Sequence, residues 1–186
     1  HTRFATVSWA RRCVYETALE QIKNDVAYSN CNVTLIGISA GISYGQLGST
    51  HHSIHDFATL RTINNMTIVA PADNFEASEV IKQAVSYNQP LYIRYGKKPM
   101  MDIHPPGTKF KIGKSILVKK GEDLTIIATG ETLQRAYLAY EILKENNIHC
   151  SIISMHTIKP FDKDTFLEIS KNSKAILTIE EHSIFG

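Results

Sequence analysis

The sequence GISAGISYGQLGSTHHSIHDFATLR occupies residues 37–61, between an apolar run at 33–36 and a segment with helical spacing. The apolar run, Val-Thr-Leu-Ile, predicts a buried strand. Glycines follow that strand at positions 37, 41, 45 and 48. They allow positive φ angles or a close approach of the backbone to a ligand. Because ligands bind just past the carboxyl ends of strands in open α/β sheets, the stretch predicts a strand, a binding loop and a helix of an α/β fold.

Three histidines at the far end of this loop allow three interpretations. His51 and His55 have the i, i+4 spacing of two metal ligands on one helix face, but no Cys or third spaced ligand lies nearby to complete a tetrahedral site. A second interpretation is that the histidines are ordinary exposed loop residues. In the third, which we favour, a histidine binds substrate or moves protons, because imidazole titrates near neutral pH.

The composition excludes several classes of function. The chain has 186 residues, of which 43% are hydrophobic and 20% charged, with a net charge of +2. Its Lys and Arg residues are scattered among acids, which argues against nucleic-acid binding. We find no apolar run of membrane-spanning length and no secretory signal. The three cysteines form no CxxC motif and fit a reducing compartment, so we expect a cytoplasmic protein.

Hydrophobic periodicity predicts alternating strands and helices. Leu19, Ile22 and Val26 form the apolar stripe of one helix. Asp73 followed by Glu76 predicts a capping box at the start of another. The expected order is strand 4–9, helix 15–30, strand 32–38, helix 55–63, strand 66–70, helix 73–87, strand 91–94, linker 99–115, strand 124–129, helix 133–146, strand 148–154, loop 156–160, helix 162–172 and strand 175–179. This βαβ order implies right-handed crossovers and two doubly wound α/β domains with mostly parallel sheets.

Several motifs, as a set, resemble the pyrimidine-binding domain of the transketolase family. That domain has a Gly-rich loop, then Thr-His, then a helix with Leu-Arg, and then Pro-x-Met/Leu and Pro-x-Asp. The matching residues here are Thr50-His51, Leu60-Arg61, Asn65-Met66 and Pro71-Ala72-Asp73. The second half, which ends in Ile179-Glu180-Glu181-His182, resembles the family's C-terminal domain. The resemblance implies a pyrimidine-binding domain over residues 1–98, without its N-terminal part, and a truncated C-terminal domain over residues 116–186.

The resemblance also implies roles for residues of the loop and of the following strand. His51 matches a histidine that contacts the substrate or moves a proton, and we expect it to be the catalytic residue. Ser39, His52 and Arg94 are the expected substrate-binding residues. A planar guanidinium suits a substrate phosphate, and the alternative for Arg94 is a surface ion pair. We expect no metal ligands in this chain.

The expected cofactor-binding residues are Val14, Thr17 and Glu20, which match the family's positions around the thiamine pyrimidine. Three residues depart from the family pattern. Val14 replaces an aromatic residue that stacks on the pyrimidine. Ala40 and Leu47 replace polar groups that bind the sugar or its phosphate.

The implied activity is that of a thiamine diphosphate- and Mg²⁺-dependent transketolase, which moves a two-carbon ketol unit between sugars. The family's diphosphate-binding Gly-Asp-Gly motif does not occur in this sequence. We therefore expect the C-terminal subunit of a split enzyme, whose N-terminal partner subunit binds the diphosphate and most of the Mg²⁺. A homodimer through the C-terminal domain is expected as well. One alternative is a diverged, non-catalytic interaction module, and another is the β subunit of a 2-oxo acid dehydrogenase, which has the same two domains.

Overall fold

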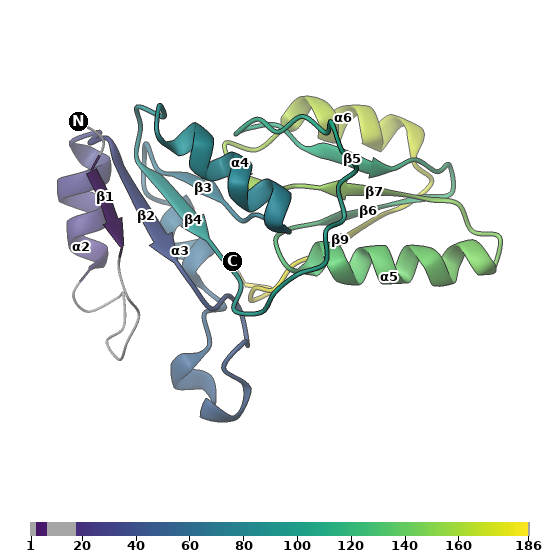
Figure 1. Ribbon diagram of the computed structural model, residues 1–186, viewed down its shortest axis with the longest axis horizontal. Coiled ribbons are helices and arrows are strands. Elements are labelled where there is room, and N and C mark those ends of the chain that lie inside the picture. Colours follow the sequence, from purple (N-terminus) through teal and green to yellow (C-terminus); the bar gives the residue numbers. More distant parts are fainter. Residues whose placement is uncertain (1–2, 7–17, 186) are drawn as a thin grey trace.

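The computed structural model describes residues 3–6 and 18–185, which form two sheets that lie side by side with helices packed on them (Figure 1). The strands are β1 (Arg3–Thr6), β2 (Val33–Gly37), β3 (Thr67–Val69), β4 (Leu91–Arg94), β5 (Ile116–Lys119), β6 (Leu124–Ala128), β7 (Cys150–Ser154), β8 (Thr157–Lys159) and β9 (Ile176–Ile179). The helices are α2 (Leu19–Gln21), continued by the π-helical segment η1 (Ile22–Tyr28), then the 3₁₀ turns η2 (Gly45–Leu47) and η3 (Ser49–His51), and α3 (Asp56–Arg61), α4 (Asn74–Ala84), α5 (Thr132–Glu145) and α6 (Lys163–Asn172).

Both sheets are mostly parallel. The first sheet has five strands in the order β1-β2-β4-β3-β8, and the second has four in the order β5-β7-β6-β9. β8 runs antiparallel to β3, and β5 runs antiparallel to β7. The other pairs, such as β2 with β4 and β6 with β7, are parallel. The predicted α/β fold class is therefore confirmed.

The first sheet is completed by a strand from the second half of the chain. We predicted a loop over residues 156–160, and this prediction was wrong, because β8 pairs with β3 through Ile68↔Lys159 and Val69↔Thr157. Nζ of Lys159 donates to the backbone carbonyls of Arg61 and Ile63 near the end of α3. Sequence periodicity missed β8 because the strand has three residues, too few to show an alternating pattern.

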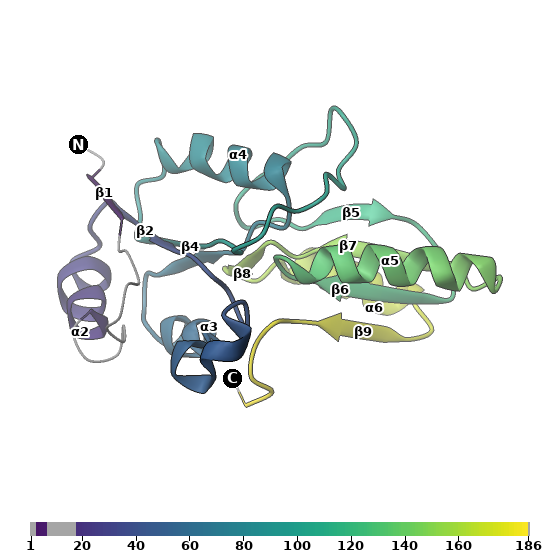
Figure 2. The ribbon, with the colours of Figure 1, turned by 60° about the horizontal axis from the view of Figure 1, so that its bottom comes forward.

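Helices cover both faces of each sheet, as the doubly wound architecture requires (Figure 2). α4 packs on one face of the first sheet, while α2, η1 and α3 lie on the other. In the second sheet, α5 and α6 occupy opposite faces. Within the described part of the chain, no helix combines the length and the apolar character needed to cross a membrane.

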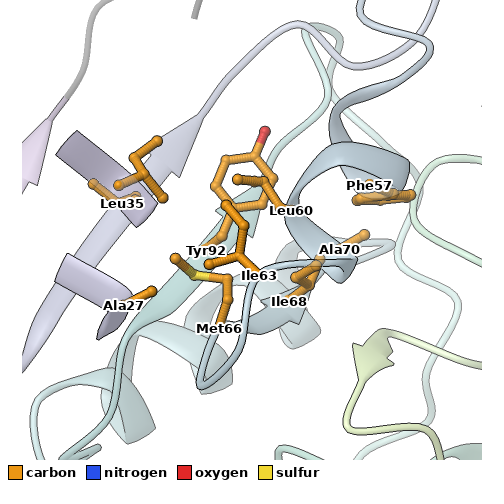
Figure 3. Close-up of a cluster of buried hydrophobic side chains, with 10 residues drawn as sticks. Ala27, Leu35, Phe57, Leu60, Ile63, Met66, Ile68, Ala70 and Tyr92 are labelled. Carbon is orange, nitrogen blue, oxygen red and sulfur yellow. The ribbon is translucent and has the colours of Figure 1, made fainter. Parts of the chain in front are cut away.

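A buried hydrophobic cluster joins η1, β2, β4 and α3 beneath the Gly-rich loop (Figure 3). Within this cluster, Met66 and Ile68 are at most 1% exposed. Tyr92 reaches into the cluster from β4, and Ile158 of β8 packs against it. The cluster fixes the positions of β2, β4 and α3, the three elements that carry the ends of the loop and its polar neighbours.

The start of α4 confirms the predicted capping box. Oδ1 of Asp73 accepts a hydrogen bond of 2.9 Å from the backbone N–H of Glu76. The Glu76 carboxylate reaches back and accepts from the N–H of Ala72 at 2.8 Å. The first bond satisfies one of the free amide groups at the start of the helix, and the second holds the backbone of the residue that precedes the N-cap.

His104, in the predicted linker, binds to this helix cap. Its Nδ1 lies 2.7 Å from Oδ2 of Asp73, its Nε2 lies 3.2 Å from Oε1 of Glu76, and the side chain is fully buried. Burial alone would lower the pKa of His104, but the hydrogen bond to Asp73 and the nearby carboxylate of Glu76 outweigh it and raise the pKa to about 9. Burial would likewise raise the pKa of Asp73, but the hydrogen bonds that it accepts from His104 and the backbone lower it to about 2. A buried imidazolium thus ties the linker to α4.

Candidate functional site

The Gly-rich loop runs from residue 38 to residue 54, between β2 and α3, and projects beyond the first sheet (Figure 1). Its base is closed by a bridge between Gly41 and Ser53, whose backbones exchange hydrogen bonds of 3.0 and 2.8 Å. Gly48 has φ 76° where η2 turns into η3, a conformation that favours glycine. The loop is thus closed at its base and contains two turns of its own, η2 and η3, which orient His51 and His52.

His51 lies exposed at the end of η3. Its Nδ1 is 3.0 Å from Oγ1 of Thr50, and the Tyr44 ring meets the imidazole edge-on with the ring centres 5.8 Å apart. Nζ of Lys97 in turn lies 4.1 Å from the centre of the Tyr44 ring. When the Thr50 hydroxyl donates to Nδ1, the proton of a neutral imidazole is on Nε2, which can then contact a ligand. This arrangement suits a group that donates to, or exchanges a proton with, a substrate hydroxyl.

The other two predicted histidines have different surroundings. Nε2 of His52 lies 3.2 Å from the carbonyl oxygen of Gly45, so His52 ties η2 to the end of η3. His55 precedes the first turn of α3, whereas His51 ends η3. Because the two residues lie in different elements, their i, i+4 spacing does not place them on one helix face. Across the described ranges 3–6 and 18–185, no three His, Cys, Asp or Glu side chains come together as metal ligands would.

Arg94 is buried at the base of the loop. Its Nη1 lies 3.1 Å from Oδ1 of Asp56, and the two side chains are only 3% and 8% exposed. Oδ2 of Asp56 also accepts a hydrogen bond of 2.9 Å from the Tyr92 hydroxyl. The guanidinium carbon lies 3.7 Å from the centre of the Phe57 ring. The alternative prediction of a surface ion pair for Arg94 was therefore wrong. Arg94 does form an ion pair, but the pair is buried away from solvent, and the guanidinium also stacks on the Phe57 ring.

The segment after β9 reaches back to α3 and the Gly-rich loop (Figure 2). Nε2 of His182 accepts a 3.3 Å hydrogen bond from the N–H of Ala58 in the first turn of α3, and its ring stacks on Phe57 with an interplanar angle of 9°. Its Nδ1 lies 3.1 Å from the carbonyl oxygen of Ser183, which can only accept. Both contacts are satisfied by a neutral imidazole that carries its proton on Nδ1.

Glu181 joins the same contacts. Its Oε1 lies 3.3 Å from the N–H of Ile42 in the loop, and its backbone carbonyl accepts from Nη1 of Arg94 at 3.4 Å. Sequence reasoning identified Glu181 only as part of a family motif and read Asp56 only as part of a short helix. The sequence did offer a signal for Asp56: it is an acidic residue at the start of this helix, five residues after His51.

The structure separates the predicted site residues into three groups. His51 and His52 lie together on the loop, whereas Ser39 and Arg94 are 4% and 3% exposed at its base. Val14 and Thr17 lie outside the described residues. The remaining predicted cofactor residue, Glu20, is exposed on α2 at the edge of the first sheet (Figure 1). The described residues therefore do not by themselves assemble the predicted pyrimidine site.

Comparisons with known proteins match both halves of the chain to domains of the same family. Residues 3–101 match the family described as "Transketolase, pyrimidine binding domain", and residues 113–186 match "Transketolase, C-terminal domain". The chain is 42% identical over 176 residues to a subunit of the apulose-4-phosphate transketolase of Phocaeicola vulgatus, covering 94% of this chain and 56% of that protein. It is 41% identical to "Putative transketolase C-terminal section" of Methanocaldococcus jannaschii, covering 91% of this chain and 53% of that protein.

A solved structure described as "Split gene transketolase, inactive beta4 tetramer" has the same fold. It superposes with a TM-score of 0.84 at 31% identity, covering 93% of this chain and 56% of the other. The chain thus spans about half the length of the curated relatives it matches.

Proposed function

The chain belongs to the transketolase family, and from this premise we propose that it acts in the C-terminal subunit of a split, thiamine diphosphate-dependent transketolase. Together with an N-terminal partner subunit, this subunit would transfer a two-carbon ketol unit between sugars. The observation that carries the proposal is the exposed His51 beside Thr50 at the tip of a Gly-rich loop. The names of the similar proteins, one of them a transketolase subunit and another a "C-terminal section", support a split enzyme.

His51 is the proposed catalytic residue. With Nδ1 beside the Thr50 hydroxyl, its Nε2 binds a hydroxyl of the sugar and moves a proton to or from it. His52 is the neighbouring substrate contact and holds the loop through Gly45. Ser39 and Arg94 contribute to substrate binding only if the base of the loop opens, because both are buried in this structure.

The family implies thiamine diphosphate, which supplies the carbanion-stabilising chemistry of ketol transfer when bound. Mg²⁺ and the diphosphate would be bound mainly by the partner subunit, since the family holds them on a domain separate from the two matched here. We also propose self-association through the second half of the chain, as the family resemblance implies. Cys31 and Cys150 are free thiols, which supports a cytoplasmic location.

The test is to purify the chain with and without the product of the adjacent gene and to measure thiamine diphosphate and Mg²⁺ binding by calorimetry, followed by ketol transfer. We expect binding and transfer in the mixture only. His51→Ala should lower the transfer rate by about 10²-fold or more, the range that positioned acid–base groups contribute. His149→Ala, at an exposed histidine in the second half, is the control and should leave the rate unchanged.

Two outcomes would count against the proposal. A mixture that binds no thiamine diphosphate would point to a diverged interaction module in place of an enzyme subunit. Full activity of the His51→Ala protein would remove His51 from the catalytic machinery and leave the subunit assignment in place.

A further inference from the structure

Residues 181–183, which follow β9, contact the Gly-rich loop on both sides of its base (Figure 2). Oε1 of Glu181 accepts a 3.3 Å hydrogen bond from the N–H of Ile42. The N–H of Ser183 donates a 2.7 Å hydrogen bond to the carbonyl oxygen of Ile54. Ile42 and Ile54 lie next to the backbone bridge that closes the loop. A short segment of the second half of the chain thus holds both ends of the loop.

The fit of this segment depends on a glycine. A Cβ atom on Gly41 would overlap the carboxyl group of Glu181, so a larger residue at this position would displace the carboxylate. Glu131, at the start of α5, fills the space beside Gly96 in the same way. The second half of the chain therefore packs directly against the backbone that follows β2 and β4.

His182, in the middle of the segment, takes the place of a local cap on α3. The N-cap residue of a helix normally accepts with its side chain from the N–H of the second or third helical residue. His55 lies at the N-cap position of α3 and makes no such bond. Nε2 of His182 instead accepts from the N–H of Ala58, the third residue of the helix, at 3.3 Å. The junction between the Gly-rich loop and α3 is thus held by a residue that is distant in the sequence.

The His182 ring is held in the orientation that this bond requires. It stacks on the Phe57 ring with the ring centres 5.4 Å apart and an interplanar angle of 9°. The Arg94 guanidinium lies on the same Phe57 ring and also donates to the carbonyl oxygen of Glu181. Nδ1 of His182 lies 3.1 Å from the carbonyl oxygen of Ser183, which places the proton of a neutral imidazole on Nδ1 and leaves Nε2 to accept. The bond to α3 therefore needs both the placed ring and this tautomer.

We propose that residues 181–183 form a clasp on the Gly-rich loop, and that His182 is a positioning residue whose Nε2 fixes the junction of the loop with α3. The part of this inference that concerns His51 rests on the function proposed above: by fixing the junction, the clasp sets the direction in which His51 meets the substrate. The loop then keeps its shape in the chain alone, before a substrate or partner binds. The geometry around His51 depends in turn on how the second half of the chain packs on the first.

The first experiment is amide hydrogen exchange of the chain alone, measured by NMR for single residues. His182→Phe keeps a ring on Phe57 and removes the acceptor, so exchange of the Ala58 amide should rise about fivefold, the effect of losing one helix N-cap. The Ser53 amide, which donates to the carbonyl oxygen of Gly41 at the base of the loop, should exchange faster as well. Amides of the buried strand β7 should not change.

His182→Gln separates the hydrogen bond from the ring. A glutamine side-chain oxygen reaches as far as Nε2 and still accepts, so this variant should restore the protection of the Ala58 amide. Glu180→Ala, at the exposed neighbouring glutamate, is the matched control and should behave like the wild type. Wild-type exchange of Ala58 or of Ser53 in the His182→Phe protein would overturn the clasp, and so would equal exchange in His182→Phe and His182→Gln.

The tautomer of His182 tests the same contact in the unaltered chain. At about pH 8, above the usual titration range of histidine, the nitrogen NMR spectrum should show a proton on Nδ1 and none on Nε2. A proton on Nε2 would contradict the proposal, because that nitrogen could not then accept from Ala58. This measurement decides the matter even if a variant fails to fold.

In the assembled enzyme, the clasp should act through His51. His182→Phe should lower kcat about tenfold with little change in KM, and His182→Gln should recover kcat. In the His51→Ala background, His182→Phe should have no further effect, because the group that it positions is absent. Equal losses of kcat in the two backgrounds would show a general structural role and refute the link to His51. The exchange and tautomer measurements need no partner subunit, cofactor or sugar, so they can succeed where the proposed function fails, and the reverse.

Discussion

Replacing Asp56 with Asn should destabilise the first half of the chain severely, because it leaves the Arg94 charge buried without a counter-charge. The two side chains are 8% and 3% exposed, with their charged atoms 3.1 Å apart. At an effective dielectric constant of about 20, their attraction is about 5 kcal/mol. Removing one partner of a buried pair typically costs about 3–5 kcal/mol. The expected loss in the free energy of unfolding is therefore about 3–5 kcal/mol.

The assay is urea unfolding followed by circular dichroism, with thermal unfolding as a second measure. For a chain of this size, each kcal/mol lowers the melting temperature by about 2–4 °C, so the drop should be about 6–20 °C. The control is Glu79→Gln, which breaks the exposed 2.6 Å ion pair with Lys82 and should cost less than about 1 kcal/mol.

A double variant sharpens the test. Asp56→Leu combined with Arg94→Met removes both charges, and replacement of a buried pair by apolar groups is often neutral. The double variant should therefore be more stable than Asp56→Asn. If Asp56→Asn costs no more than Glu79→Gln, the Arg94 charge is not desolvated in solution and the reasoning fails.

Two further predictions concern stability away from the loop. The pKa of His104 rises from 6.5 to about 9 on folding, so protonated His104 should add at most about 3 kcal/mol to the free energy of unfolding. This contribution should be complete below pH 6.5 and lost as the pH rises through 9. His104→Gln should make the free energy of unfolding less dependent on pH across that range, and an unchanged pH dependence would contradict the buried imidazolium. Leu133→Ala, at a fully buried position of α5, should cost about 2–5 kcal/mol. Leu138, on the same helix, is 45% exposed, so Leu138→Ala should lower the free energy of unfolding only slightly. If the two variants lowered the urea midpoint equally, α5 would not pack as described.

Local signals in the sequence were sufficient where a structure depends on neighbouring residues. Asp73 and Glu76, three residues apart, form the predicted cap because the geometry of a helix N-terminus brings their side chains to its free amides. The helix predicted over residues 133–146 is observed as α5, Thr132–Glu145, because its periodicity continues for several turns. The Gly-rich loop after β2 was likewise predicted from its glycines and from its place after a strand.

The contacts around the loop could not be predicted in the same way. Arg94 meets Asp56 across 38 positions of sequence, and Ile42 meets Glu181 across 139. Both contacts depend on how β2, β4 and the segment after β9 are placed in space, and hydrophobic periodicity contains no information on that placement. For this reason Arg94 was expected to face a ligand, whereas the structure has it paired and buried.

By itself, the sequence determined the α/β class, the family and the loop that carries His51, because these follow from motifs and periodicities along the chain. The tertiary structure alone decided that β8 completes the first sheet, that Arg94 is neutralised by Asp56, and that two glutamates of the second half lie in the spaces left by Gly41 and Gly96. The physical reason is the same in each case. Burial and charge pairing are properties of residues that meet only when segments distant in the sequence pack together, and a carboxylate or guanidinium has no preferred partner until that packing brings one within reach.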